Sequence, residues 1–524
     1  MFIKSSILLP LATLSFPASA ALTCSPASIP KPDILGASII DVHANEAHNY
    51  TSVSIGPGSN DGGKYTISFC NVTVVYTHPG WNDTIHTQVW LPLENWNGRF
   101  QAIGGGGYST GFGSVYLTYA VAQGFAAAST DGGVPGDSGD SGAVTIVATD
   151  LSWALSSRNN VNWLLMHNYA SKATKDMADI GKQIIKAYYR RGARYSYFSG
   201  CSGGGRQAFS MAQQFPDAFD GILAVAPAIN LETFIPAGYW PTLIMDQTRT
   251  YPSPAELDGF VSAAVSACDG LDGVHDNIIS LPHLCNVTAF DFIGQRYTSN
   301  GIQHTLTASS ARVVQAAWSG SGKAGYPGVN KDAPLTPYYI PTTCSADNTT
   351  CHSTGSPLFG NWISYLLAKD PDFSPAGISQ AEFFRFLRVS KTDYGSMLAT
   401  SNPDLSGFRS HGGKMITWHG LADEVIPPEG LARYYNRVLD LDPHAHDFFR
   451  FFQAPGVGHC HGGSGPVPNG ALKQLIDWVE RGAAPDTLRA TRGVNITSRD
   501  LCPYPLQQSY IGGDPGRAES FGCA

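Results

Sequence analysis

The sequence has few charged side chains and no cluster of basic ones. Lys, Arg, Asp and Glu make up 14% of the 524 residues, and the formal net charge is −8. Nucleic acids and anionic lipids are bound mainly through clustered positive charge, so neither is an expected partner. The chain also has no later run of apolar residues long enough to cross a bilayer, and no spacing of Cys and His resembles a zinc site.

The first 20 residues are arranged like a secretory signal peptide. Lys4 precedes a short apolar stretch, and small residues end the segment at Ala18-Ser19-Ala20. A membrane anchor is the alternative, but the apolar stretch is short and Pro10 interrupts it. We therefore expect cleavage after Ala20 and an extracellular protein.

Ten cysteines follow the predicted signal peptide, and their even number predicts five disulfides formed in an oxidising compartment. Six Asn-x-Ser/Thr sequons are consistent with secretion and are candidate glycosylation sites; they begin at Asn49, Asn71, Asn82, Asn286, Asn348 and Asn495.

The apolar pattern predicts an α/β protein with a large insertion. Strands are expected at 72–76, 87–91, 99–103, 125–129, 195–199, 221–225, 414–419 and 448–452, and helices near 177–188, 208–215, 431–439 and 472–479. This alternation predicts a parallel sheet with covering helices. The alternation of strands and helices is lost between about 229 and 406, a stretch that is rich in Pro and Gly and contains four cysteines. We expect a catalytic domain in two parts, 21–228 and 408–524, with a lid domain at 229–407.

Gly200-Cys201-Ser202-Gly203-Gly204 matches G-x-S-x-G, the nucleophile turn of α/β-hydrolases. An aromatic strand precedes this turn and an amphipathic helix follows it, as the motif requires. Ser202 is therefore the candidate nucleophile, and the backbone N–H of Gly203 is a candidate oxyanion donor. An idle serine in a glycine-rich loop is the alternative interpretation.

A second glycine run, Gly104-Gly105-Gly106-Gly107, follows an early strand. A glycine loop in this position can bring another backbone N–H to the oxyanion, as in lipases. Gly104, Gly105 and Gly106 are thus further candidates, and a flexible turn is the alternative.

The acid and the base should follow the serine in that order along the chain. Asp423 lies just past the predicted strand 414–419, at the strand end where such sheets bind ligands. Glu424 and Asp447 are alternatives; Glu424 should point elsewhere, and Asp447 opens a strand at the opposite end of the sheet.

His459 is the candidate base, because it lies in a glycine-rich loop after the last long strand; His461 and His419 are alternatives. Cys201 immediately precedes the serine, and Cys460 immediately follows this histidine. If the two were bonded, their Cα atoms would lie about 5.5 Å apart and the serine and histidine would be neighbours. A buried free thiol is the alternative for Cys201.

The segments 200–207, 418–423 and 458–460 resemble the nucleophile, acid and histidine segments of the tannase and feruloyl esterase family. The resemblance covers nearly all of the chain after residue 20. It implies an α/β-hydrolase fold with an inserted lid, a Ser-His-Asp esterase mechanism and a disulfide between Cys201 and Cys460. We expect the other cysteines to pair as Cys24–Cys70, Cys268–Cys285, Cys344–Cys351 and Cys502–Cys523.

The resemblance also implies a structural calcium ion in the lid. Carried over by position, the ligands are the side chains of Asp269, Asp272 and Asp276 and the carbonyls of Val274 and Ile278. Carboxylate and carbonyl oxygens on a bent loop suit Ca²⁺, although the spacing departs from an EF-hand and a solvated acidic turn is the alternative.

The expected activity is hydrolysis of hydroxycinnamate esters, such as ferulate esters of plant cell-wall sugars, and the expected partner is a phenolic ester or a feruloylated polysaccharide. Galloyl ester hydrolysis, which is tannase activity, is the alternative within esterases. An inactive α/β-hydrolase that only binds is the alternative of another class. The lid aromatics Tyr239, Trp240 and Phe359 are expected in its core rather than in a substrate slot. The sequence is silent on oligomeric state.

Overall fold

A computed structural model describes residues 23–60, 62–134, 148–299, 301–322, 325–345, 350–493 and 497–524. The predicted signal peptide and the sequons at Asn348 and Asn495 lie outside these residues. Of the other sequon asparagines, Asn49, Asn82 and Asn286 are exposed, and Asn71 is half-buried. In the described part of the chain, no helix combines the length and apolar character needed to cross a membrane.

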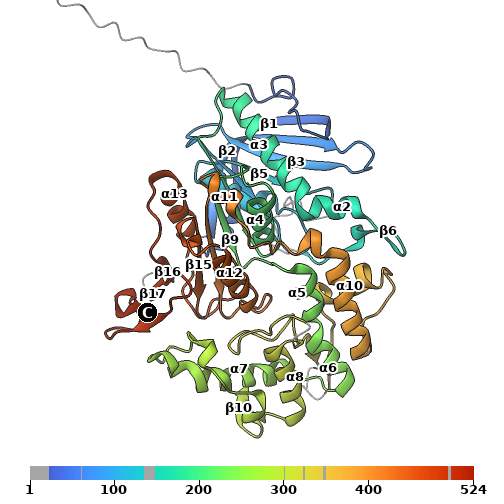
Figure 1. Cartoon of the computed structure of the whole chain (residues 1–524), viewed down its shortest axis with the longest axis vertical. Helices are drawn as coiled ribbons and strands as arrows, with labels where there is room; N and C mark the ends of the chain where they lie inside the picture. The colour runs from blue at the N-terminus through green and yellow to red at the C-terminus, as the bar shows by residue number, and fades with distance from the viewer. Residues whose placement is uncertain are drawn as a thin grey trace, which may run out of the picture.

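One nine-stranded mixed sheet forms the centre of the molecule (Figure 1). In spatial order its strands are β1 (Ser38–Ile55), β2 (Gly62–Thr77), β3 (Ile85–Pro92), β5 (Ala126–Thr130), β4 (Arg99–Ile103), β8 (Tyr195–Cys201), β9 (Gly221–Val225), β14 (Lys414–Gly420) and β15 (Phe449–Ala454). The first three strands run antiparallel to their neighbours, and the six from β5 to β15 are mutually parallel. The predicted α/β fold is confirmed, and the predicted strands 72–76 and 87–91 lie in the antiparallel neighbours β2 and β3.

Helices cover both faces of the sheet, because the strands are apolar on both sides. Along β8, Tyr197 packs into one buried cluster and Phe198 into the other, as strand alternation requires. One face is covered by α3 (Ala173–Tyr189), α4 (Gly203–Gln214), α11 (Ser406–Ser410) and α12 (Glu429–Leu441), and the other by α1 (Ser114–Ala122) and α13 (Ala471–Arg481).

Most of the segment between β9 and β14 lies in the lower half of the view in Figure 1, and helices are its main regular elements. We call residues 229–407 the lid. Its helices are α5 (Leu231–Gly238), α6 (Trp240–Thr248), α7 (Pro254–Cys268), α8 (Ala308–Ser319), α9 (Pro357–Asn361) and α10 (Gln380–Leu398), with α11 at its end. Its described strands form two small hairpins, β10 (Arg296–Ser299) with β11 (Ile302–Thr305) and β12 (Thr342–Cys344) with β13 (Cys351–Ser353), and none joins the central sheet.

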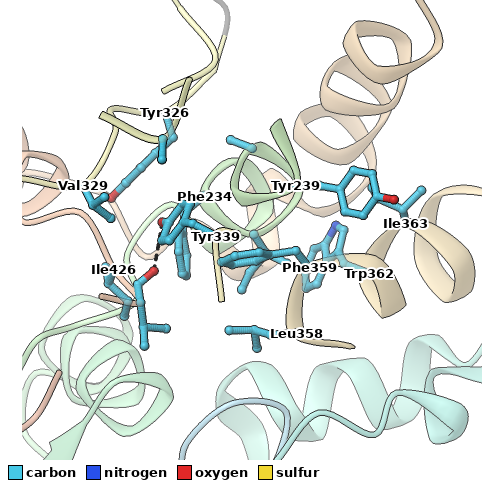
Figure 2. Packing of buried hydrophobic residues seen from close by; sticks show 14 of the residues in the cluster. Phe234, Tyr239, Tyr326, Val329, Tyr339, Leu358, Phe359, Trp362, Ile363 and Ile426 are labelled. Atoms are coloured by element: carbon cyan, nitrogen blue, oxygen red, sulfur yellow. Dashed lines mark hydrogen bonds between the residues drawn. The ribbon is translucent and has the colours of Figure 1, made fainter. Parts of the chain in front are cut away.

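The lid has its own aromatic core, and one loop that follows a strand of the central sheet packs into this core. Figure 2 shows Phe234, Tyr239 and Phe359 packed together, and all three are buried. These aromatics belong to the core, as expected, and Trp240 packs against them from a half-buried position. Ile426, from the loop after β14, belongs to the same cluster. The lid core is therefore continuous with a loop at the carboxyl end of the sheet.

Smaller elements complete the chain. They are α2 (Trp163–His167), the hairpin β6 (Leu155–Ser157) with β7 (Asn160–Val161), and two C-terminal hairpins, β16 (Leu488–Arg492) with β17 (Thr497–Leu501) and β18 (Gln508–Tyr510) with β19 (Phe521–Cys523). All five expected disulfides are present: Cys24–Cys70, Cys201–Cys460, Cys268–Cys285, Cys344–Cys351 and Cys502–Cys523.

Candidate active site

Ser202 lies on a sharp turn between β8 and α4. Its backbone has φ 61° and ψ −121°, a conformation that costs a non-glycine residue free energy and persists only where its surroundings enforce it. Two hydrogen bonds fix the turn: Ser202 N–H donates to the Val225 carbonyl at 3.0 Å, and Ala228 N–H donates to the Ser202 carbonyl at 3.1 Å. The side chain is half-buried and stands beside the N-terminus of α4, whose dipole favours negative charge nearby.

The glycine loop after β4 packs directly on the first turn of α4. A Cβ atom on Gly203 would lie 3.1 Å from Gly106 Cα and 3.2 Å from Gly107 N, so a larger residue would push the two segments apart. Glycine at 203 permits this approach without displacing either segment.

The backbone N–H groups of three of the four loop glycines already have acceptors within the protein. Gly104 donates to the Ser199 carbonyl, Gly105 to Gln207 Oε1 and Gly106 to the Ser109 carbonyl, at 3.0, 3.0 and 3.2 Å. The oxyanion role expected of Gly104, Gly105 and Gly106 stays a prediction, and each of these amides would have to leave its present acceptor to fulfil it. Among the described residues, the amides of Gly107 and Gly203 have no acceptor, and these two glycines are neighbours.

Two buried side chains of α4 hold the glycine loop, and sequence reasoning assigned them no role. Gln207 receives the Gly105 amide and donates to the Thr110 carbonyl at 3.0 Å. Arg206 is fully buried, donates to the Tyr169 and Ala170 carbonyls at 2.9 Å, and lies over the Tyr169 ring. Tyr169 in turn donates its hydroxyl to the Gly107 carbonyl at 2.8 Å. The sequence signal for this role was the position of Arg206 and Gln207 directly after the serine turn.

Asp423 is fully buried in the loop after β14 and accepts hydrogen bonds at both carboxylate oxygens. The amides of Val425 and Ile426 donate to Oδ1 at 2.8 Å each. His459 Nδ1 and His419 Nε2 each lie 2.9 Å from Oδ2. Burial alone would raise the pKa of Asp423, but the charge of His459 and these hydrogen bonds outweigh it and hold the pKa well below its ordinary value.

His459 presents one ring nitrogen to Asp423, which leaves Nε2 as the nitrogen available to a reacting group. Burial would lower the pKa of His459, but the negative charge of Asp423, its hydrogen bond and the charge of Glu424 together raise it. The backbone N–H of His459 donates to Glu424 Oε2 at 3.0 Å. Two adjacent acids thus hold this histidine, one by its ring and one by its main chain.

The Cys201–Cys460 disulfide joins the serine turn to the histidine loop. The Cα atoms of the two cysteines are 5.9 Å apart across a sequence separation of 259 residues. Ser202 and His459 are the immediate chain neighbours of these cysteines. The serine, histidine and aspartate segments are therefore brought to one place, at the carboxyl ends of β8, β14 and β15.

The alternative residues take other positions. His419 is buried behind Asp423, and its Nε2 must carry hydrogen because it also contacts the Ile426 carbonyl at 3.0 Å. His461 is exposed on the same loop as His459. Asp447 is exposed and precedes β15, at the opposite end of the sheet.

The acidic loop of the lid does not form a ready-made metal cage. Asp269 Oδ1 accepts the amides of Asp276 and Ile278, and Asp272 Oδ1 accepts the amide of Val274. Within the described residues, no three His, Cys, Asp or Glu side chains are placed to hold a metal ion. Asp276 Oδ2 pairs with Arg499 at 2.9 Å, while Oδ1 is buried without a partner among the described residues. Burial raises the pKa of Asp276, and the charges of Asp272 and Asp269 add to the rise against the opposing charge of Arg499.

A cleft of about 830 Å³ lies between the lid and the histidine loop. His459 and Glu424 line one wall, and α7 and the lid residues near 332–337 line the other. The lid also holds the acid loop directly, because Tyr339 donates its hydroxyl to the Val425 carbonyl at 3.0 Å (Figure 2). Asn330 donates to the Leu421 carbonyl at 2.8 Å.

Comparisons with known proteins match almost the whole chain. A family model described as tannase and feruloyl esterase matches residues 70–524. A probable feruloyl esterase of Arthroderma benhamiae is 36% identical over 510 residues, which cover 95% of this chain and 93% of the relative. The solved tannin acyl hydrolase of Aspergillus niger has a TM-score of 0.83 and 26% identity, with coverage of 97% and 96%. Feruloyl esterase B of Aspergillus oryzae has a TM-score of 0.76 and 26% identity, with coverage of 94% and 97%.

Proposed function

The chain belongs to the tannase and feruloyl esterase family, whose members are carboxylic ester hydrolases, and we propose that it releases hydroxycinnamic acids such as ferulic acid from plant cell-wall esters. The observation that carries this proposal is the constellation around Asp423: a buried carboxylate holds His459, and a disulfide ties the histidine loop to the Ser202 turn.

In the proposed mechanism, Ser202 Oγ attacks the ester carbonyl carbon while its proton passes to His459 Nε2. The C–O bond to the alcohol then breaks, and the same proton is given to the leaving oxygen. Water, deprotonated by His459, attacks the acyl-serine, and the proton returns to Ser202 as the acid leaves. Asp423 keeps the ring in the tautomer with hydrogen on Nδ1 and stabilises the imidazolium.

The oxyanion of each tetrahedral intermediate is proposed to lie against the amides of Gly203 and Gly107. Both N–H groups lack acceptors among the described residues, and the close packing of the two glycines supports a joint role. Preorganised donors of this kind stabilise the charge that develops in the transition state. Gln207, Arg206 and Tyr169 would fix the loop that carries Gly107.

We also propose that Ca²⁺ binds the acidic loop of the lid through Asp269, Asp272 and Asp276 and the carbonyls of Val274 and Ile278. The buried, unpartnered Oδ1 of Asp276 and the mutual repulsion of the three acids support a cation there. When bound, the ion would supply charge neutralisation and loop stability, and the chemical step would not use it.

Five disulfides support secretion into an oxidising compartment, and exposed sequons at Asn49, Asn82 and Asn286 support glycosylation there. We propose that the enzyme acts outside the cell on feruloylated polysaccharide.

Turnover of methyl ferulate, methyl caffeate and methyl gallate by the purified protein and its Ser202→Ala variant tests the proposed activity. We expect the two hydroxycinnamates to be preferred, and a loss of at least about 10³-fold in kcat in the variant, with unchanged circular dichroism. Preference for the gallate would make the enzyme a tannase. No turnover of any of the three esters by the unaltered protein would favour a binding module.

A further inference from the structure

The cleft beside His459 has no place yet in the mechanism. Its lining includes the loop from Gly456 to Ser464, but neither Ser202 nor the glycines 104–107 and 203. The cleft therefore reaches the base without touching the nucleophile or the proposed oxyanion donors. Its volume of about 830 Å³ lies in the upper part of the range for small-molecule sites, roughly 300–1,000 Å³.

The proposed chemistry fixes which part of the substrate faces this side. His459 must protonate the leaving alcohol, so the alcohol oxygen has to lie within hydrogen-bonding reach of its ring. A cleft that is lined by His459 and by none of the oxyanion donors is placed to receive the alcohol portion of the ester rather than the phenolic acyl group.

The lining identifies the kind of alcohol. Ser262, Ser266 and Asn277 are exposed at the cleft, and their side chains make no hydrogen bonds to other described residues. Within the described residues, no lysine or arginine lines the cleft, while two carboxyl groups, Glu424 and Asp332, do. The carboxyl oxygens of Asp332 are buried, and burial raises its pKa to about 7 against the opposing backbone amides of Asp332 and Ile279 and the charge of Lys331.

We propose that this cleft is a subsite for a neutral sugar, the pentose or hexose unit that carries the feruloyl ester and the units attached to it. Hydroxyl, amide and carboxyl side chains suit a neutral polyol. A lining that holds two carboxyl groups and, among the described residues, no lysine or arginine disfavours a uronic acid, whose carboxylate would be repelled. This inference rests on the proposed esterase function, because it uses His459 as the acid that protonates the leaving group.

Binding of unesterified sugars tests the subsite without any turnover. The probes are an arabinose-substituted xylo-oligosaccharide and an oligogalacturonide of equal length, titrated calorimetrically into the wild type. The blocking variant is Ser262→Trp. The matched control is Ala267→Trp, an exposed residue of the same helix that does not line the cleft. Unchanged melting temperatures would show that both variants fold.

We expect the neutral sugar to bind the wild type, and Ser262→Trp to weaken this binding about tenfold. Ala267→Trp should bind the neutral sugar as the wild type does, and the galacturonide should not bind. In kinetics, Ser262→Trp should lower kcat/KM for a feruloylated arabinoxylo-oligosaccharide about tenfold and leave methyl ferulate within about twofold. Equal binding of both sugars, equal loss on both esters, or no sugar binding would overturn the subsite. Loss of all ester turnover in the wild type would instead overturn the esterase function, and the sugar titration would still decide the subsite.

Discussion

Two acidic loops of this molecule are built in different ways. The loop after β14 buries Asp423 with hydrogen bonds to both oxygens, from two amides and two histidines, and the pKa of this acid is lowered. The lid loop after α7 half-buries Asp276, which has one arginine partner and one unpartnered buried oxygen, and the pKa of this acid is raised. Each loop lies near a disulfide, so covalent bracing does not explain the difference.

The two acids differ in how many of their carboxylate oxygens the protein itself satisfies: both for Asp423, and one for Asp276. Asp423 needs nothing further, because the protein supplies every donor, and its position is set before substrate arrives. Asp276 has one arginine partner, but burial and the charges of Asp272 and Asp269 still raise its pKa. We infer that the first loop serves the chemistry and the second serves the stability of the lid.

The largest expected effect is on the rate when each acid is neutralised. Asp423→Asn should lower kcat on methyl ferulate about 10³–10⁴-fold, because an amide cannot hold the Nδ1–H tautomer of His459. Asp276→Asn is the matched change in the other loop and should leave kcat within about twofold. Equal losses of kcat in the two variants would show that the two loops do not have separate roles in catalysis and in lid stability.

Removal of the Cys201–Cys460 bridge should have the next largest effect, on stability and activity together. The double change Cys201→Ala with Cys460→Ala should cost on the order of 5 kcal/mol of unfolding free energy, because a very long loop is released. Cys344→Ala with Cys351→Ala opens a separation of only 7 residues, should cost about 2 kcal/mol, and should leave kcat unchanged. Denaturant titration and methyl ferulate turnover measure both; unaltered activity in the first pair would argue against a role in aligning the site.

Chelation should affect the lid loop alone. With excess chelator, we expect the melting temperature to fall by a few degrees while kcat changes little, because bound Ca²⁺ stabilises only the folded state. The melting temperature of Asp276→Asn should be lower than that of the wild type before chelator is added, and should fall less when chelator is added. An unchanged melting curve, together with metal analysis that finds no calcium, would exclude the proposed ion.

The smallest expected effect concerns Glu424, which bonds the main chain of His459 and adds negative charge beside it. A raised pKa keeps the base protonated, and inactive, to higher pH, so the acid limb of kcat/KM lies above that of an isolated histidine. Glu424→Gln keeps an acceptor but removes the charge, so the acid limb should move to lower pH with little loss at the plateau. Glu424→Ala should also reduce the plateau. An acid limb that stays in place in the Gln variant would limit Glu424 to a structural role.

The sequence predicted the elements that follow local rules and missed those that depend on distant contacts. The G-x-S-x-G turn, β9 and the loops carrying Asp423 and His459 were predictable, because strand periodicity and glycine placement are local signals. The long edge strand β1 and the lid helices were not predicted, since their stability comes largely from packing against other elements. Asp276 and Arg499 pair across 223 residues of sequence, and no local sequence pattern indicates this pairing.

The glycine loop shows the same limit within the site. A run of four glycines indicated a loop near the serine, but the choice among them depends on which amides already have acceptors. That information resides in Gln207, Ser199 and Ser109, which sequence patterns do not connect to the loop.

Covalent capture tests the central claim most directly. The protein would be treated with an aryl fluorophosphonate, which phosphonylates an activated serine, then digested and analysed by mass spectrometry. We predict a single adduct on Ser202 in the wild type and its loss in His459→Ala, with the Cys201–Cys460 peptide pair intact in both. A labelled residue other than Ser202, or equal labelling of Ser202 in the histidine variant, would contradict the account.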